Sequence, residues 1–183
     1  NEMSLNIGER LDLLVKEIYN IAEKEFNINS TQQLAKILFD DLKLTQIKKR
    51  STAENVLKEL VNEHELPELI LSYRKLNKLK NTYIDALPAS INKKTKRIHS
   101  TFNQTIAATG RLSSTGPNFQ NIPIRTVDGR EIRKSFIAQQ KNWGIFSADY
   151  SQIELRIMAH LSEDKELCKA CLLYTSPSPR DVL

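Results

Sequence analysis

Asp149 is the residue of this chain best placed for chemistry. It follows Gly144–Phe146, an apolar stretch rich in strand formers, and it precedes Ile153, Ile157 and Leu161, which repeat at helical spacing. The hydrophobic period therefore changes close to the carboxylate, and a strand-to-helix junction would hold it rigidly and leave it exposed. We expect a ligand of a metal-dependent enzyme here, with a structural carboxylate bonded to N–H groups near a helix N-terminus as the alternative.

Glu154 has two interpretations. Ser151 and Glu154 have the S-x-x-E spacing of a capping box, with Ser151 as N-cap and Glu154 reaching back to its backbone. Glu154 is therefore either a cap or a group at a ligand site, and the spacing leaves both open.

A second cluster could grip a phosphate, a sugar or a base edge. Gly110 lets the backbone approach a ligand, and Arg111 offers five donors in a planar fork, although a surface arginine in a turn is an equal alternative. Three amides that both donate and accept follow at Asn118, Gln120 and Asn121. Positive charge comes next, from Arg125, Arg130, Arg133 and Lys134.

Basic residues concentrate in this part of the chain. Residues 93–140 hold nine Lys and Arg against Asp128 and Glu131, a net charge of +7 within a total of +5, so the remainder carries −2. Clustered positive charge favours a polyanionic partner, because neutralising phosphates releases counterions. A solvated basic face is the other interpretation.

The first 90 residues have the pattern of a helical unit. One amphipathic face consists of Leu11, Leu14, Val15, Ile18 and Ala22. Capping boxes at Ser30 and Ser51 predict the starts of two short helices, and Pro67 predicts the start of a longer one that ends at Pro88. The buried stripe of that last helix comprises Leu69, Tyr73, Leu76, Tyr83 and Leu87.

Strands and loops are predicted after Pro88. Residues 97–106 alternate loosely, as an extended segment does, and residues 109–125 are dense in Gly, Ser, Pro and Asn, as an ordered loop is. The Asp128-Gly129 pair predicts a hairpin-like turn over residues 127–130, followed by a strand over residues 132–138.

Four ordered motifs resemble family A DNA polymerases, the family of bacterial DNA polymerase I. They are TGRLSS at 109–114, PNFQNIPIR at 117–125, GREIRKSF at 129–136 and SADYSQIELRIMAHLSED at 147–164. Looser similarity upstream extends the resemblance over roughly residues 10–165. Lys96 departs from it, since the family usually has glycine in the turn before RIH, and so does Phe119, where leucine is usual.

The resemblance implies an α+β fold. A helical thumb, residues 1–92, would hold the primer-template duplex, and residues 93–165 would form the first part of a palm built on an antiparallel sheet. The fingers, the rest of the palm and a second catalytic aspartate would lie outside these residues, so we expect a truncated enzyme that is inactive alone.

The resemblance also assigns the site. Asp149 would be the first catalytic, metal-binding aspartate, and Tyr150 would lend its carbonyl oxygen to the same ion. Gln152, Ile153 and Glu154 would line the nucleotide pocket, Glu154 lying under the sugar. The residues on DNA would be Arg111 in the minor groove near the primer terminus, Gln120, Asn121 and Arg125 near the active site, and Arg133 on a phosphate.

The implied activity is DNA-directed DNA polymerisation in replication and repair. Two Mg²⁺ ions would activate the primer 3′-hydroxyl and stabilise the leaving pyrophosphate, which requires at least two carboxylates, of which this chain supplies one. The implied partners are primer-template DNA and deoxynucleoside triphosphates, and we expect a monomer. Two other functions remain open: a non-catalytic nucleic-acid-binding module, and a single-subunit RNA polymerase.

Residues 166–183 lie outside the resemblance. Residues 171–181, CLLYTSPSPRD, resemble a translated sequencing adapter, with an authentic flexible tail as the alternative. Cys168 and Cys171 have C-x-x-C spacing, but no second pair or nearby His supports a zinc or redox site.

Composition favours a soluble globular protein, with 40% hydrophobic and 27% charged residues among 183. No apolar run reaches the roughly 18 residues of a membrane span, and the first 20 residues lack the pattern of a signal peptide. We therefore expect a cytoplasmic protein without a membrane partner.

Overall fold

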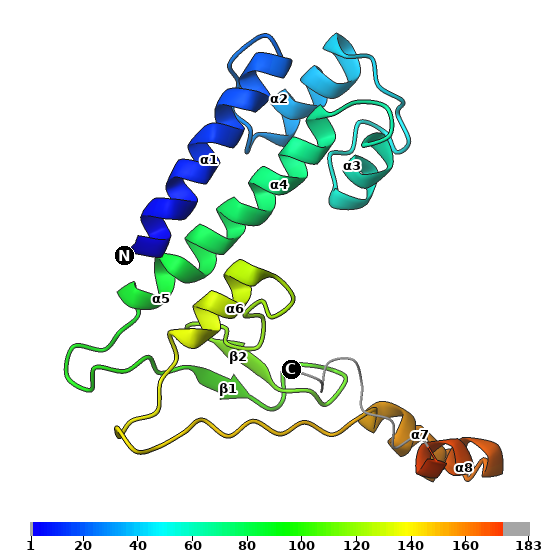
Figure 1. Ribbon diagram of the computed structural model, residues 1–183. Helices are drawn as coiled ribbons and strands as arrows, with labels where there is room; N and C mark the ends of the chain where they lie inside the picture. The colour runs from blue at the N-terminus through cyan, green and yellow to red at the C-terminus, as the bar shows by residue number, and fades with distance from the viewer. Residues whose placement is uncertain (1, 174–183) are drawn as a thin grey trace. The chain divides into compact units, whose positions relative to one another are not determined.

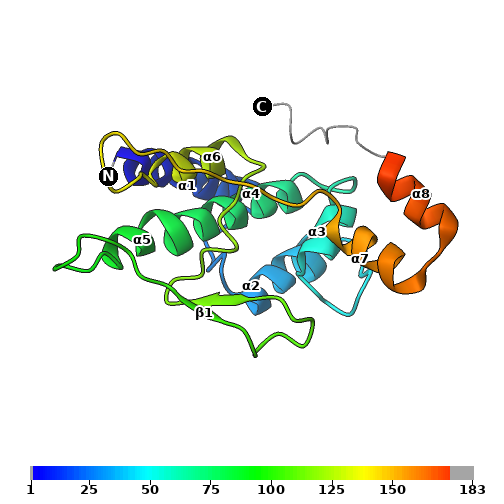
Figure 2. The ribbon, with the colours of Figure 1, turned by 90° about the horizontal axis from the view of Figure 1, so that it is seen from below.

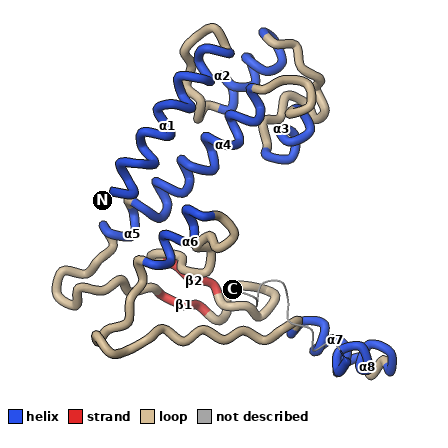
Figure 3. Tube along the Cα trace, in the orientation of Figure 1, coloured by secondary structure: helices blue, strands red, loops and turns tan. Residues whose placement is uncertain are grey.

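The computed structural model describes residues 2–173. Its backbone separates into two compact units, Asn1–Phe136 and Ile137–Leu183, each described here by itself. Helices dominate, with one small antiparallel sheet, so the predicted α+β class is confirmed at this level (Figure 3).

Two long helices organise the first unit. α1 (Glu2–Ile21) and α4 (Leu66–Leu79) lie side by side (Figures 1 and 2). The predicted apolar face of α1 is buried at Leu11 and Ile18, and Pro67 lies in the first turn of α4 as predicted. An ion pair of 2.9 Å between Arg10 of α1 and Asp128 ties this helix to the later part of the unit.

Short helical elements cover one end of this pair. α2 (Thr31–Lys36) begins as predicted, because the hydroxyl of Ser30 accepts from the Gln33 N–H at 3.4 Å. It continues directly into a π-helical turn, η1 (Ile37–Asp41), and α3 (Glu54–Leu60) follows a loop. The prediction of Ser51 as a cap is wrong: Ala53 is the N-cap of α3, and the Ser51 hydroxyl accepts from the Ala53 N–H in the preceding turn.

The predicted helix from Pro67 to Pro88 has three parts. After α4 come a second π-helical turn, η2 (Lys80–Ile84), and α5 (Ala86–Ala89). The π turn is closed by an Asp85 N–H to Lys80 carbonyl bond of 2.9 Å. The side chains of these two residues also bond each other, the Lys80 amine donating to the Asp85 carboxylate. Both are hydrogen-bonded to the hydroxyl of Ser4 on α1.

Two hydrophobic clusters stabilise the first unit. The first joins the end of α1 to α2, η1, α3 and the start of α4. The second joins the start of α1 to the end of α4, η2, α5 and α6. Both clusters therefore depend on helix faces whose apolar spacing is visible in the sequence.

The sheet is smaller than predicted. β1 (Thr101–Asn103) pairs antiparallel with β2 (Ser113–Thr115), in a register that places Phe102 opposite Ser114. β1 lies within the segment predicted to be extended, and β2 lies within the segment predicted to be a loop.

α6 (Val127–Lys134) replaces the predicted hairpin turn and strand, which are wrong. The Thr126 hydroxyl accepts from the Gly129 N–H at 3.1 Å, so the Asp-Gly pair forms a capped first helical turn. Ile132 is buried against the second cluster, which stabilises the helix by its apolar side.

The second unit contains α7 (Ile153–Ser162) and α8 (Lys165–Leu173). The strand predicted before Asp149 is wrong: residues 144–148 have no strand pairing, and Ile145 and Phe146 are 65% and 90% exposed. A strand needs hydrogen bonds to a neighbouring strand, and the described part of this unit contains no strand that could provide them.

Two further expectations concern a membrane span and the C-terminal tail. Across residues 2–173, no helix combines the length and the apolar character needed to span a bilayer. Most of the proposed adapter translation, residues 174–181, lies outside the described residues, and the origin of that tail stays a prediction.

Candidate nucleic-acid and metal site

Asp149 and Tyr150 lie on an exposed stretch just before α7. Every residue from 141 to 150 is exposed, and Tyr150 is exposed at 80%. Asp149 makes no hydrogen bond or ion pair to any residue between 2 and 173. Both oxygens of the carboxylate are therefore open to a ligand, as a metal-binding carboxylate requires. The alternative, a structural carboxylate bonded to N–H groups at a helix terminus, would need such bonds.

The start of α7 differs from the predicted capping box. The N-cap is Gln152, in a left-handed conformation with φ of 51°, and its side chain forms no cap bond. Arg156 donates from Nε to the Ser151 carbonyl at 3.0 Å, so it is the Ser151 backbone that is held. Ile153 is half-buried and Glu154 exposed in the first turn, which places the three predicted nucleotide-pocket residues consecutively at one helix end.

The described side chains do not form a metal cluster by themselves. Within the described part of the chain, no three His, Cys, Asp or Glu side chains gather closely enough to hold an ion. Mg²⁺ prefers oxygen ligands and is often held by one or two carboxylates, with water and substrate phosphates completing the shell. The Asp149 carboxylate and the Tyr150 carbonyl fit one side of such a shell, and a pair of ions requires a further carboxylate.

The predicted DNA-binding residues all lie in the first unit. We use the name amide loop for residues 117–123, which connect β2 to the segment before α6. Gln120 and Asn121 of this loop are exposed, and Arg125 just beyond it is exposed too. Arg111, also exposed, follows Gly110, whose φ of 73° is the left-handed conformation that glycine adopts without strain.

Arg133 is committed to backbone groups. From α6, its Nε donates to the Pro123 carbonyl at 3.2 Å and its Nη2 to the Ile122 carbonyl at 3.0 Å. These bonds fix the end of the amide loop. A phosphate contact by Arg133 stays a prediction.

Tyr83 was predicted only as a core residue. It is 5% exposed in η2, and its hydroxyl donates to the Asn121 carbonyl, so it joins the helical pair directly to the amide loop. A tyrosine on a buried helical stripe signals that its hydroxyl needs a partner, although no sequence pattern indicates which one.

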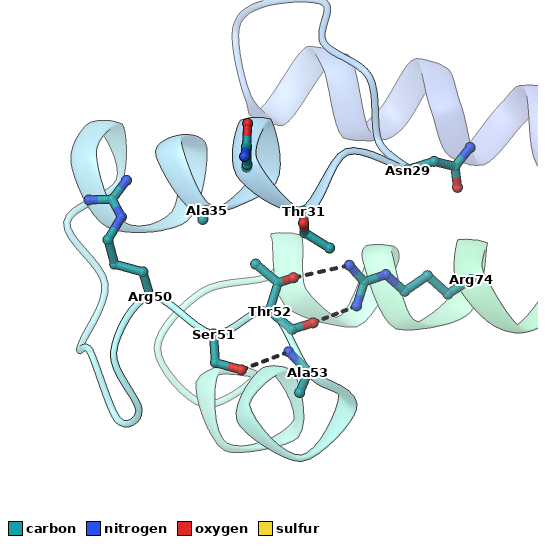
Figure 4. Close-up of a pocket in the computed structure, with 9 residues that line it drawn as sticks. Asn29, Thr31, Ala35, Arg50, Ser51, Thr52, Ala53 and Arg74 are labelled. Atoms are coloured by element: carbon teal, nitrogen blue, oxygen red, sulfur yellow. Dashed lines mark hydrogen bonds between the residues drawn. The ribbon is translucent and has the colours of Figure 1, made fainter.

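A separate pocket, which none of these residues line, lies among α2, the loop before α3 and α4 (Figure 4). Its volume is about 810 Å³, and its walls mix polar and apolar groups from Asn29, Thr31, Gln32, Ala35, Arg50, Ser51, Thr52, Ala53 and Arg74. Both arginines there are engaged. Arg50 forms two bonds to the Asp40 carboxylate, which lowers the pKa of that carboxyl, and Arg74 bonds the Thr52 carbonyl at 2.5 Å. Burial lowers the pKa of Arg74.

Comparison with known proteins decides the family. The family model described as DNA polymerase family A matches residues 1–174. This chain belongs to DNA polymerase family A. The resemblance inferred from the four motifs is thereby confirmed.

Family A relatives are similar along most of the chain. DNA polymerase I of Pseudomonas aeruginosa is 51% identical over 173 residues, which are 91% of this chain and 19% of the relative. The thermostable DNA polymerase I of Thermus aquaticus is 49% identical over 173 residues, 91% of this chain and 21% of the relative. The chain thus spans about a fifth of the length of the curated relatives that it matches.

A solved family A structure has the same fold over this region. It is the POL domain of Pol1 from M. smegmatis in complex with DNA primer-template and dNTP, with a TM-score of 0.81 and 41% sequence identity. The match covers 92% of this chain and 30% of that one.

Proposed function

We propose that this chain is part of a DNA-directed DNA polymerase, which adds deoxynucleotides to a primer 3′ end under the direction of a template, in DNA replication and repair. The observation that carries the proposal is the similarity at 41% identity to a POL domain in complex with primer-template and dNTP, over 92% of this chain. The exposed Asp149 and the exposed side chains of Gln120 and Asn121 in the amide loop supply chemistry that suits this activity.

The two parts of the chain take different roles in this proposal. Residues 1–92, a helical region built on α1 and α4, act as the thumb that holds the duplex. Residues 93–165, which include the β1–β2 hairpin, α6 and α7, form the first part of the palm. The partners are primer-template DNA and deoxynucleoside triphosphates, bound by a monomer.

Contacts to DNA come from the exposed polar residues of the first unit. The Arg111 guanidinium reads acceptors that every correct base pair presents in the minor groove, which checks pairing without sequence preference. The amides of Gln120 and Asn121 lie against the template-primer, and Arg125 binds a phosphate, where it sets register. The net charge of +7 over residues 93–140 supports a polyanionic partner.

Catalysis is assigned to the start of α7. Asp149 offers its carboxylate, and Tyr150 its carbonyl, to one divalent cation, for which Mg²⁺ is proposed. When bound, Mg²⁺ would neutralise charge on the phosphates and activate the primer hydroxyl. Gln152, Ile153 and Glu154 line the nucleotide pocket, where the bulk of Glu154 under the sugar excludes a 2′-hydroxyl.

The activity is testable in a chimera. Residues 1–165 replace the matched segment of the Pseudomonas aeruginosa polymerase, and primer extension is measured on a defined template. We expect extension, and we expect Asp149→Asn to reduce its rate about a thousandfold, since a metal ligand contributes several kcal/mol of transition-state stabilisation.

Glu163→Gln is the matched control, because Glu163 is an exposed acid in the same unit and lies within the transplanted residues. It should leave extension unchanged. A chimera that folds and binds primer-template but extends no primer would contradict the polymerase function, as would full activity of the Asp149→Asn variant.

A second function, duplex binding without reaction, is favoured for the 183 residues alone. Its support is that the proposed site offers one carboxylate, that of Asp149, whereas a pair of ions requires a further one. The isolated chain should then bind primer-template in a salt-sensitive manner and incorporate no nucleotide. Incorporation by the isolated chain would refute this.

A further inference from the structure

The amide loop has an unusual backbone environment. Three consecutive carbonyls, those of Asn121, Ile122 and Pro123, each accept a hydrogen bond from a side chain, and those side chains come from two different helical elements. Loops on protein surfaces usually leave such groups to water. Here the backbone is fixed while the side chains of Gln120 and Asn121 stay exposed.

Tyr83 holds the loop from the side of the helical pair. Its hydroxyl, at the end of a 5% exposed side chain, donates to the Asn121 carbonyl. Tyr83 lies within the π-helical turn η2, where it is buried. Lys80 and Asp85 at the two ends of that turn are joined by an ion pair of 2.6 Å, which stabilises the turn.

Arg133 holds the loop from the side of α6. Its fork spans two successive carbonyls, which a lysine with a single amine would match poorly. α6 lies very close to the loop, since a Cβ at Gly129 would be only 2.7 Å from the Pro123 Cβ. The guanidinium is therefore positioned by a tight helix-to-loop contact.

Contacts at the start of the loop complete the restraint. The Phe119 N–H donates to the buried Ser114 hydroxyl at 3.1 Å, and the Phe119 ring meets Phe136 edge to face at 5.6 Å. The Gln120 N–H donates to the Asn118 side chain at 2.9 Å. Every residue from 119 to 123 thus has a backbone group held by a named side chain.

We propose that Tyr83 and Arg133 are positioning residues, which hold the backbone of the amide loop so that Gln120 and Asn121 meet primer-template DNA in one fixed geometry. The inference rests on the proposed function for its DNA ligand. It assigns Arg133 to the loop backbone and not to a DNA phosphate, and it gives a core tyrosine a role in DNA binding. Restraining these amides before binding lowers the entropy lost on binding.

Salt dependence separates positioning from a phosphate contact. Binding of the 183-residue chain to a fluorescent primer-template is measured by anisotropy between 50 and 200 mM salt, with Tyr83→Phe, Arg133→Gln and Arg133→Lys. Positioning predicts about threefold to tenfold weaker binding by all three variants, with the slope of log affinity against log salt unchanged. Arg125→Gln is the control, and its slope should become shallower by about 0.9, as expected when one phosphate contact is lost.

Two results would overturn the inference for Arg133. One is a slope that is shallower by about 0.9 in Arg133→Gln and restored in Arg133→Lys, because a phosphate needs only a charge. The other is unchanged affinity in all three variants. If Arg133→Gln does not fold, the affinity of Tyr83→Phe for primer-template tests the positioning of the loop, because this variant removes one oxygen and no charge. Unchanged affinity would overturn the inference.

Hydrogen exchange on the free protein tests positioning without DNA. The amides of Phe119 and Gln120 should exchange at least about threefold faster in Tyr83→Phe and Arg133→Gln, and at the unchanged rate in Arg125→Gln. Uniformly faster exchange across α1 and α4 would instead show a general loss of stability and would contradict a positioning role. If the wild-type chain fails to bind primer-template, the proposed function fails, whereas the exchange data still decide whether these residues hold the loop.

Discussion

Ser4, Lys80 and Asp85 form a small polar cluster that braces η2. The Asp85 carboxylate accepts from the Lys80 amine at 2.6 Å and from the Ser4 hydroxyl at 2.7 Å. The hydrogen bond from Lys80, and to a lesser extent that from Ser4, holds the pKa of the Asp85 carboxyl below its usual value of 3.8. Since the carboxylate is 42% exposed, solvent screening keeps the contribution of the pair below about 1 kcal/mol.

Asp85→Asn should therefore matter in a pH-dependent way. A carboxyl whose pKa is lowered by folding stabilises the protein above its unfolded pKa, and this stability is lost as pH falls through the lower folded value. The variant should be less stable than wild type at pH 7, and the difference should shrink as the pH falls through the lowered pKa of the folded Asp85 carboxyl. Urea unfolding at a series of pH values measures it.

Asp12→Asn is the matched control for this experiment. Asp12 is exposed on α1, and its carboxylate forms no hydrogen bond or ion pair to any described residue. The free energy of unfolding of Asp12→Asn should differ little from that of wild type at every pH. A pH-independent loss in Asp85→Asn would show that the bonds, and not the charge, stabilise the turn.

Single residues were predictable where short motifs carry them. Asp149 is exposed, as its predicted place at a change of hydrophobic period requires, while the roles of Asp149, Arg111 and Gln120 stay predictions. The turn at Lys96 is also instructive, since the family usually has glycine there and Lys96 adopts φ of 58°. In contrast, the bonds of Tyr83 and Arg133 to the amide loop join residues far apart in sequence, and no local pattern specifies such partners.

At the level of whole elements, close packing of α6 against the amide loop has a testable consequence. A Cβ at Gly129 would lie 2.9 Å from the Pro123 carbonyl oxygen and 2.9 Å from the Thr126 hydroxyl oxygen. Gly129→Ala should therefore destabilise the protein by about 1–3 kcal/mol, because backbone must move to relieve the overlap. This outweighs the roughly 1 kcal/mol by which alanine favours a helix.

Gly8→Ala provides the control on α1. The added Cβ would meet only the Lys80 side chain, at an ordinary 3.8 Å, so this variant should gain about 0.5–1 kcal/mol from helix propensity. Chemical denaturation of both variants gives the two free energies of unfolding. Stabilisation of both would contradict the close contact between α6 and Pro123.

Element prediction succeeded where local signals and burial agree. Ser30 caps α2, and Pro67 opens α4, because each signal precedes an apolar stripe that the core buries. It failed at residues 127–130, where Asp-Gly suits both a hairpin and a first helical turn and the Thr126 cap decides for the helix. The two π turns carry no sequence signal of their own, since they depend on one extra residue per turn.

The distribution of buried apolar residues sets the stability of the molecule as a whole. Both hydrophobic clusters consist of residues from the first unit, Asn1–Phe136. The second unit exposes large apolar side chains in its described part: Ile137, Trp143, Ile145, Phe146, Tyr150, Leu155, Ile157, Met158 and Leu161. Exposed apolar surface of this extent favours association.

A shortened chain ending at Phe136 should consequently keep most of the thermal stability. Because both core clusters remain, we expect its Tm within about 4 °C of that of the full chain, a change of roughly 1 kcal/mol. It should also bind less of a hydrophobic dye and stay monomeric at higher concentration, since the exposed apolar residues are removed. Calorimetry and light scattering on the two chains measure these effects. A fall in Tm of more than about 10 °C would mean that residues 137–183 contribute to the core, and that the two units stabilise each other.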